Sequence, residues 1–355
     1  MREVVIVASC RSAVGRRKGA LSNVRPDELA AVVLDDLMNR AQVDKQLVDD
    51  VILGCVTQIN EQAMNVARTA ALIAGFPIHV PGVTIDRQCG SSQQAVHFGA
   101  QAIAAGDMDV VIAGGVESMT RSPMFANVGD VKTSKKLTDL YEIVNQGISA
   151  EKIADKWGFS REQLDEFAYK SHERAIKAIE KGYFADEIVP VDVTDEQGES
   201  HIFKVDEGPR VDTSMDALSQ LNPVFKEDGK ITAGNASQMS DGASAVLLMS
   251  REKADELGVT PQAKVIARTV VGSDPTLMLT GPIAATRKAL ERADLTIDDI
   301  DRYEVNEAFA PVPLAWLADT KANPKKLNVN GGAIALGHPL GATGTRLLTS
   351  LLSEL

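Results

Sequence analysis

Short apolar runs alternate with segments of helical periodicity along most of the chain. Apolar runs bounded by turn or charged residues predict strands at 2–8, 51–54, 83–85, 109–113 and 244–249. Helical spacing of apolar residues, or long series of small residues, predicts helices at 26–37, 63–74 and 91–105. Strands that alternate with helices in this way indicate an α/β fold with a largely parallel sheet.

The last third of the chain repeats the order of the first third. Strands expected at 263–271, 303–305 and 327–330 alternate with helices expected at 282–293 and 342–355. We therefore expect two duplicated α/β halves packed on central helices. Two strands follow the first central helix, at 91–105, whereas the sequence ends with the second, at 342–355. The C-terminal half is thus expected to lack its last strands, either because the chain is truncated or because another segment completes it.

The middle of the chain differs in composition from both halves. From Met119 it is more charged and richer in turn residues, and it contains a clear helix at 160–181 that begins with the capping pair Ser160 and Gln163. We expect an N-terminal half of residues 1–118 plus 240–251, an inserted loop domain of residues 119–239, and a C-terminal half of residues 252–355.

Composition and charge narrow the class of protein. The 355 residues are 44% hydrophobic and 24% charged, which is ordinary for a globular protein. A net charge of -12 argues against a nucleic acid or an anionic membrane as partner. No apolar run reaches the roughly 20 residues of a membrane span. Three cysteines, at 10, 55 and 89, lack paired spacing, so we expect a cytoplasmic protein with no metal site and no disulfides.

One cysteine stands where a nucleophile would stand. Cys89 lies between the apolar run at 83–85 and the small-residue helix, in a turn that Gly90 makes tight. Serines 91 and 92 suit the start of that helix, whose positive end would lower the thiol pKa from about 8.5 by one or more units. A buried structural cysteine remains an equally good interpretation of this stretch alone.

Four motifs resemble those of the thiolases, the acetyl-CoA acyltransferases. They read Cys-Gly-Ser-Ser at 89–92, Thr-Ala-Gly-Asn-Ala-Ser at 232–237, Asn-Glu-Ala-Phe at 306–309 and Asn-Gly-Gly-Ala-Ile-Ala-Leu-Gly-His-Pro at 330–339. The resemblance covers essentially the whole chain. It implies thiolytic cleavage of 3-oxoacyl-CoA by CoA to acyl-CoA and acetyl-CoA, through an acyl-Cys89 intermediate. CoA is then a substrate, and no other cofactor is implied.

The resemblance also assigns roles to single residues. Cys89 would be the nucleophile, His338 would activate it, and Asn306 would help to stabilise negative charge on the thioester oxygen through a bound water. The residues implied to bind substrate or CoA are Arg210, Ala233, Ser237, Ala308 and Phe309. The family forms dimers or tetramers, so a homodimer or homotetramer is expected.

The chain departs from the family at one catalytic position. Thiolases carry a second cysteine in a glycine-rich motif near the C-terminus, and this sequence ends before that motif. Loss of one general acid or base typically costs about 10²- to 10⁴-fold in rate, so poor turnover is expected. A non-catalytic CoA- or lipid-binding protein is therefore an alternative, as is a Cys-His hydrolase.

The sequence features that predict the direction of the reaction are weaker. Residues 145–147 lack the His-Met-Gly segment typical of the biosynthetic thiolases, and Gln93 and Gln94 follow the nucleophile. These features favour a degradative thiolase of fatty-acid β-oxidation, and an acetoacetyl-CoA-forming biosynthetic thiolase is the alternative. A related 3-oxoacyl-acyl-carrier synthase is disfavoured, because Asn306 stands where that family has a second histidine.

Overall fold

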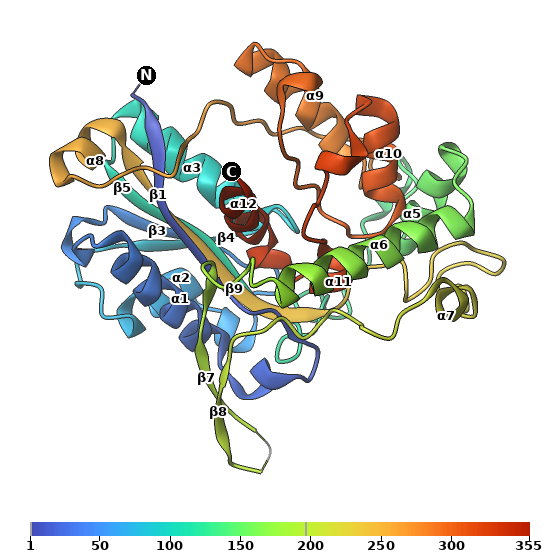
Figure 1. Cartoon of the computed structure of the whole chain (residues 1–355), viewed down its shortest axis with the longest axis horizontal. Helices are drawn as coiled ribbons and strands as arrows, with labels where there is room; N and C mark the ends of the chain where they lie inside the picture. Colours follow the sequence, from blue (N-terminus) through green and yellow to red (C-terminus); the bar gives the residue numbers. More distant parts are fainter. Residues whose placement is uncertain (1, 196) are drawn as a thin grey trace.

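One mixed sheet organises the protein. The computed structural model describes residues 2–195 and 197–355. The sheet has the strand order β10-β1-β9-β5-β3-β4 (Figure 1). The strands in this order are β1 (Val4–Ser12), β3 (Asp50–Gly54), β4 (Gly82–Ile85), β5 (Val110–Ser118), β9 (Ser240–Ser250) and β10 (Ala263–Lys264). Two short strands complete the sheet, β2 (Gly15–Arg16) beside β9 and β6 (Ile188–Val189) beside β1. Strand β3 runs parallel to β4 and β5, whereas β9 runs antiparallel to β1 and β5. The expectation of a largely parallel sheet is therefore only half right.

Helices cover both faces of this sheet, because its central strands are apolar on both sides. On one face, α1 (Pro26–Ala41) and α2 (Val66–Ile73) share a core with Val5 and Leu247. On the other, α3 (Ser91–Ala105) shares a core with Ile6 and Val246. The C-terminal helix α12 (Thr343–Glu354) packs on α3 and β9. The expected α/β architecture with two central helices is therefore confirmed.

The segment after β5 leaves the sheet and returns to it as β9. The two strands pair along their whole length, from Val110 opposite Met249 to Ser118 opposite Asp241, as the apolar run at 244–249 predicts. Between them lie α4 (Lys135–Thr138), α5 (Gln146–Lys156), α6 (Arg161–Glu180) and α7 (Met215–Ser219), with the short strands β6 (Ile188–Val189), β7 (Val191–Thr194) and β8 (Ser200–Phe203). Ser160 and Gln163 form the expected capping box at the start of α6. The domain boundaries themselves stay a prediction.

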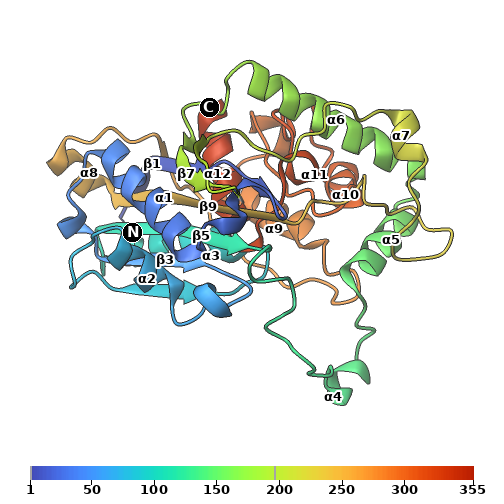
Figure 2. The ribbon, with the colours of Figure 1, turned by 90° about the horizontal axis from the view of Figure 1, so that it is seen from below.

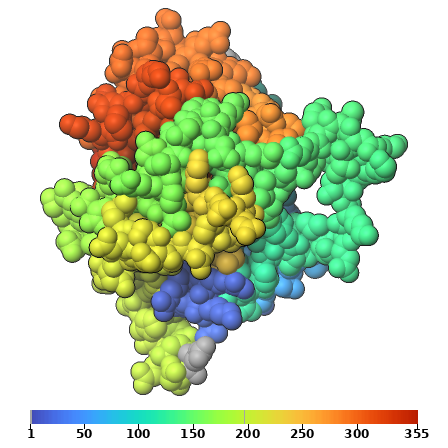
Figure 3. Space-filling view, turned by 90° about the vertical axis from the view of Figure 1, so that its right-hand side faces the viewer, coloured from blue at the N-terminus to red at the C-terminus, as the bar shows by residue number. Residues whose placement is uncertain are grey.

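Part of this segment projects from the body of the molecule. The arm that carries α4 extends away from the sheet (Figure 2), and in the space-filling view it stands clear of the rest of the chain (Figure 3). It exposes several large apolar side chains, namely Phe125, Val128, Val131, Leu137, Leu140, Tyr141 and Ile143. This arm is the least buried part of the molecule that the structure describes.

The C-terminal half forms helices but no sheet of its own. Its helices are α8 (Arg251–Leu257), α9 (Gly281–Ala293), α10 (Pro311–Thr320), α11 (Ala333–Leu336) and α12. Of the strand expected at 263–271 only β10 forms, and it pairs with β1. The strands expected at 303–305 and 327–330 share a single parallel bridge between Tyr303 and Leu327. Two strands that pair only with each other are marginally stable, whereas β3 is stabilised by a neighbouring strand on each side. Among the residues that the structure describes, the segments at 303–305 and 327–330 have no such further neighbours, so only the bridge forms between them.

In the part of the chain that the structure describes, no helix is both long enough and apolar enough to span a bilayer.

Candidate active site

The turn between β4 and α3 presents Cys89. Gln88 lies in the left-handed region of the backbone (φ 48°), which costs a non-glycine residue about 1–2 kcal/mol. Local hydrogen bonds hold this turn: Asp86 Oδ1 accepts from the Gln88 N–H (2.7 Å), and Ser91 Oγ accepts from the Arg87 N–H (2.8 Å). The Ser91 hydroxyl donates in turn to the Gln88 carbonyl (2.6 Å). The strand, tight turn and helix predicted around the cysteine are all present.

The thiol of Cys89 lies in apolar surroundings. It packs against a small cluster made by Val56, Met119, Met124 and Leu340. Burial raises the pKa of the Cys89 thiol to about 11, the negative charges of Glu117 and Asp86 act in the same direction, and a backbone hydrogen bond opposes them. The expectation of a lowered pKa is therefore wrong for the resting protein. Loss of hydration is the largest cause of the raised pKa, because the neighbours of the sulfur are apolar.

His338 is buried and its ring has a defined tautomer. Its Nδ1 lies 2.7 Å from Thr343 Oγ1, and that hydroxyl donates its only proton to the Pro339 carbonyl (2.8 Å). The hydroxyl must therefore accept from Nδ1, which leaves Nε2 without a proton and able to act as a base. Burial, followed by the positive charge of Arg346, lowers the pKa of His338 to about 3. The ring is neutral at physiological pH.

Asn306 lies beside this histidine. Its Nδ2 is 3.3 Å from Nε2 of His338, so the structure brings together two of the three residues expected to be catalytic. The next residue, Glu307, is buried and fixes this segment, since its carboxylate accepts from Ser171 Oγ (2.7 Å) and Asn328 Nδ2 (2.9 Å). Burial raises the pKa of Glu307, and these hydrogen bonds oppose that effect. The motif at 306–309 is thus anchored by its glutamate and presents its asparagine to the histidine.

A buried carboxylate joins the histidine turn to the cysteine pocket. Glu117, at the end of β5, accepts hydrogen bonds of 2.8–3.0 Å from the N–H groups of Val56, Thr57 and Gly341 and from Gln62 Nε2. Val56 and Leu340, the neighbour of Gly341, belong to the apolar cluster against which Cys89 packs. The turn that carries His338 is therefore attached to the wall of the Cys89 pocket. A single acidic residue in an otherwise apolar strand was the available sequence signal, and sequence reasoning missed it.

The residues expected to line a CoA channel come together in two adjoining segments. The Ser237 N–H donates to the Ala308 carbonyl (3.0 Å), and Ala236 forms an antiparallel bridge with Phe309. Ala233 lies in the same loop and is exposed. Phe309 is buried and packs edge-on against Phe225, with ring centroids 5.9 Å apart. The two motifs thus form one surface, to which Phe309 contributes mainly packing.

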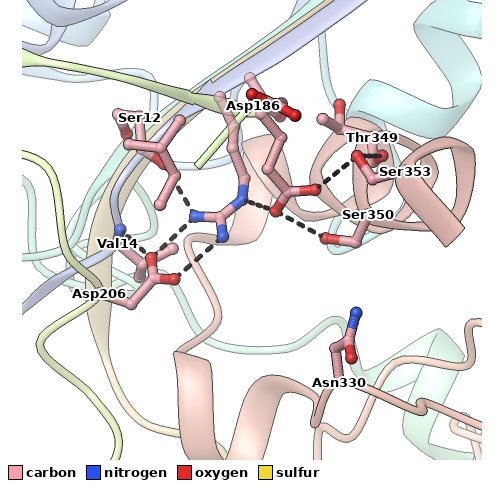
Figure 4. Close-up of polar contacts among 12 residues, drawn as sticks. Ser12, Val14, Asp186, Asp206, Asn330, Thr349, Ser350 and Ser353 are labelled. Atoms are coloured by element: carbon pink, nitrogen blue, oxygen red, sulfur yellow. Dashed lines mark hydrogen bonds and ion pairs between the residues drawn. The ribbon is translucent and has the colours of Figure 1, made fainter. Parts of the chain in front are cut away.

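Arg210 is the last residue of the segment 206–210, which hydrogen bonds to buried side chains hold in place. Its side chain is exposed, and its N–H donates to Nδ1 of the buried His172 (3.1 Å). Four residues earlier, Asp206 accepts two hydrogen bonds, at 2.8 and 2.9 Å, from the buried guanidinium of Arg11 (Figure 4). The structure thus holds the segment 206–210 firmly while leaving the Arg210 guanidinium open to solvent.

No three His, Cys, Asp or Glu side chains among residues 2–195 and 197–355 lie together in a group suited to a metal ion.

Comparison with known proteins decides the family. The model of the thiolase N-terminal domain matches residues 4–252, and that of the thiolase C-terminal domain matches residues 259–355. The chain belongs to the thiolase family. It is accordingly an acyltransferase of the acetyl-CoA C-acyltransferase type. Both the family and the enzyme class expected from the four motifs are confirmed.

Individual thiolases are similar to this one over its whole length. The steroid 3-ketoacyl-CoA thiolase FadA6 of Mycobacterium tuberculosis is 48% identical, over 100% of this chain and 88% of that protein. The 3-ketoacyl-CoA thiolase of Bacillus subtilis is 45% identical, over 100% of this chain and 93% of that protein. The crystal structure of the Bacillus anthracis acetyl-CoA acetyltransferase superposes with a TM-score of 0.92 at 43% identity, covering 100% of this chain and 92% of that one.

Proposed function

We propose that this thiolase cleaves 3-oxoacyl-CoA by thiolysis, with Cys89 as nucleophile, His338 as base and Asn306 as a stabiliser of negative charge. The observation that supports these roles is the arrangement of the histidine: Thr343 holds its Nδ1–H, and Asn306 Nδ2 faces its Nε2. A neutral imidazole whose Nε2 carries no proton can take the proton of a neutral thiol. Both groups have the protonation state that such a transfer needs.

The first half-reaction transfers the acyl group to sulfur. As the Cys89 sulfur attacks the 3-keto carbon, its proton moves to Nε2 of His338. The C2–C3 bond then breaks, its electron pair remains on the acetyl-CoA fragment as an enolate, and that fragment leaves as acetyl-CoA after its C2 takes the proton held on His338. Asn306 and His338 are placed to stabilise the negative charge on the thioester oxygen, because a neutral amide polarises a bound water without titrating.

The second half-reaction returns the acyl group to CoA. The thiol of an incoming CoA attacks the acyl carbon and its proton moves to Nε2 of His338. The bond between that carbon and the Cys89 sulfur then breaks, and the sulfur takes the proton back from His338. The products are an acyl-CoA shortened by two carbons and a free enzyme. Because acetyl-CoA leaves before CoA binds, the kinetics should be ping-pong, with parallel lines in initial-rate plots.

CoA is proposed to approach along the two adjoining segments. Ala233, Ser237 and Ala308 have small side chains, which let a slender pantetheine arm pass close to the backbone, with Phe309 packed beneath. Arg210 is exposed and is free to meet the adenine end of the ligand. No cofactor besides CoA is proposed.

A degradative role is favoured over a biosynthetic one. Two of the similar proteins named above are 3-ketoacyl-CoA thiolases, and the apolar cluster around Cys89 is suited to an acyl chain. We place the enzyme in the cytoplasm, which suits its three free cysteines. A homodimer or homotetramer is proposed, because β4 is an edge strand and Phe98 of the adjoining α3 is 41% exposed.

Intact-protein mass spectrometry tests this function. Incubation with a 3-oxoacyl-CoA should add the mass of one acyl group to the wild type and nothing to Cys89→Ala. The same pair should differ in the exchange of labelled CoA into acetyl-CoA, which needs the acyl-cysteine step but no carbon–carbon chemistry. An acyl group retained by Cys89→Ala, or exchange catalysed by that variant, would show that another residue is the nucleophile.

A further inference from the structure

Gln238 lies where the CoA-binding segments meet the catalytic histidine. It directly follows Ser237 and is half-buried. Its side-chain Nε2 donates toward three carbonyl oxygens, those of Gly208 (2.9 Å), Ile334 (3.0 Å) and Ala335 (3.1 Å). One amide group therefore connects the segment 206–210 with the helix α11.

The contact with α11 is a helix cap. The last carbonyls of a helix have no partner within it, and Ile334 and Ala335 are the middle residues of this short helix. The chain then turns sharply at Gly337, whose φ of 101° favours glycine, and His338 follows. By satisfying these carbonyls, the Gln238 amide fixes the end of the helix two residues before the base begins.

The backbone of Gln238 also contacts His338 directly. Its carbonyl accepts from the His338 N–H (3.2 Å) and from Ser240 Oγ (2.9 Å). The Ser240 hydroxyl oxygen also lies 3.1 Å from the same His338 N–H. The base is thus attached to residue 238 both directly and through α11.

The Gln238 amide also contacts Gly208, which lies in the segment 206–210 that is proposed to bind CoA. A Cβ at position 208 would lie 2.3 Å from the Ala335 carbonyl oxygen, so this segment rests directly on α11. Asp206 is tied to Arg11, and Arg210 is tied through its N–H to His172. Any shift of the segment 206–210 therefore acts on the same amide that caps the helix leading to His338.

We propose that Gln238 is a positioning residue that couples the CoA-binding segment 206–210 to the catalytic base His338. The inference rests on the proposed function, because it takes His338 as the base and Arg210 as a CoA contact. Gln238 itself performs no chemistry. Its amide sets the position of both segments at once, so CoA binding and acyl transfer should change together when the amide is removed.

The exchange of labelled CoA into acetyl-CoA measures both effects in the 355-residue chain. Gln238→Met keeps an unbranched side chain of similar length but removes the donor. We expect kcat for exchange to fall about tenfold and KM for CoA to rise several-fold, since three carbonyls lose one shared donor. Gln220→Met is the matched control, because Gln220 is exposed in the same inserted segment and, among residues 2–195 and 197–355, its side-chain amide donates only to Ser219 Oγ (3.4 Å).

Two further measurements distinguish a positioning role of Gln238 from a role in the stability of the fold. The rate at which iodoacetamide alkylates Cys89 should match the wild type, which shows that the nucleophile pocket is intact. Calorimetric titration with CoA alone should show the weaker binding without any reaction. If Gln238→Met does not fold, Gln238→Asn retains an amide on a shorter stem and should show the same paired change at smaller size.

Each outcome of these measurements either supports the proposed coupling or overturns it. A paired change in kcat and KM with normal alkylation supports the coupling. A change in KM alone, in kcat alone, or in thermal stability alone overturns it. Failure of the proposed function is a separate result, since it would appear as exchange by Cys89→Ala or as no exchange by the wild type.

Discussion

The protonation states of Cys89 and His338 define the resting site. His338 is buried and Cys89 is partly buried, and loss of hydration favours the neutral form of each, so the pKa of the thiol is raised to about 11 and that of the imidazole is lowered to about 3. The proton therefore stays on sulfur until substrate arrives. A thiolate–imidazolium pair is not the ground state, and proton transfer has to accompany attack on the carbonyl.

The neutral state of the Cys89 thiol should be visible in the pH dependence of its alkylation by iodoacetamide. Because only the thiolate reacts, the second-order rate should rise about tenfold per pH unit between pH 7 and 9, with no plateau in that range. Rates followed by mass spectrometry, with Cys89→Ala as the blank, give the profile. A flat profile with an inflection below pH 7 would instead reveal a preformed ion pair.

The sequence motifs predict which residues react, and that prediction stays untested, but the motifs do not reveal the chemical state of those residues. Cys89, His338 and Asn306 stand in motifs of unusual composition, and the structure brings Asn306 and His338 together. The raised thiol pKa was not predictable, because it depends on apolar neighbours contributed by distant parts of the chain. Glu117 and Gln238 were missed for the same reason, since their roles lie in contacts with Gly341 and Gly208.

At the scale of elements, helices were more predictable than strands. The helix expected at 91–105 coincides with α3, and that expected at 282–293 differs from α9 by one residue. A helix satisfies its backbone hydrogen bonds locally, so its own sequence largely decides whether it forms. The strand expected at 303–305 depends on neighbours elsewhere in the chain, and only the bridge between Tyr303 and Leu327 forms.

The close approach of β5 to the histidine turn depends on one glycine. A Cβ at Gly115 would lie 2.0 Å from the Gly341 carbonyl oxygen, so Gly115→Ala must push the turn away from the Cys89 pocket. We expect CoA exchange to fall at least tenfold, because misplacing a catalytic group by about 1 Å can cost 10²-fold. Gly272→Ala is the control, since nothing lies within 4 Å of its Cβ. Equal exchange rates in the two variants would refute this account of the interface.

At the scale of the whole molecule, one buried ion-pair network joins three regions. Arg11 of β1 donates to Glu187 (2.6 Å) and to Asp206, both in the inserted segment, and Ser350 and Ser353 of α12 donate to the same Glu187 (Figure 4). Burial alone would lower the pKa of Arg11, but the two carboxylates outweigh it and raise that pKa. The N-terminal sheet, the segment that leads to Arg210 and the C-terminal helix therefore share one set of charges.

Removing the guanidinium should weaken all three regions together. Arg11→Met leaves two buried carboxylates without their cation, which costs about 3–5 kcal/mol of unfolding free energy. Urea unfolding beside Arg17→Met, an exposed arginine six residues along the chain, measures that loss. Because Asp206 begins the segment 206–210, the folded variant should also bind CoA more weakly, whereas Cys89 should alkylate normally. Unfolding that matches the Arg17→Met control would mean that packing, not this network, holds the three regions together.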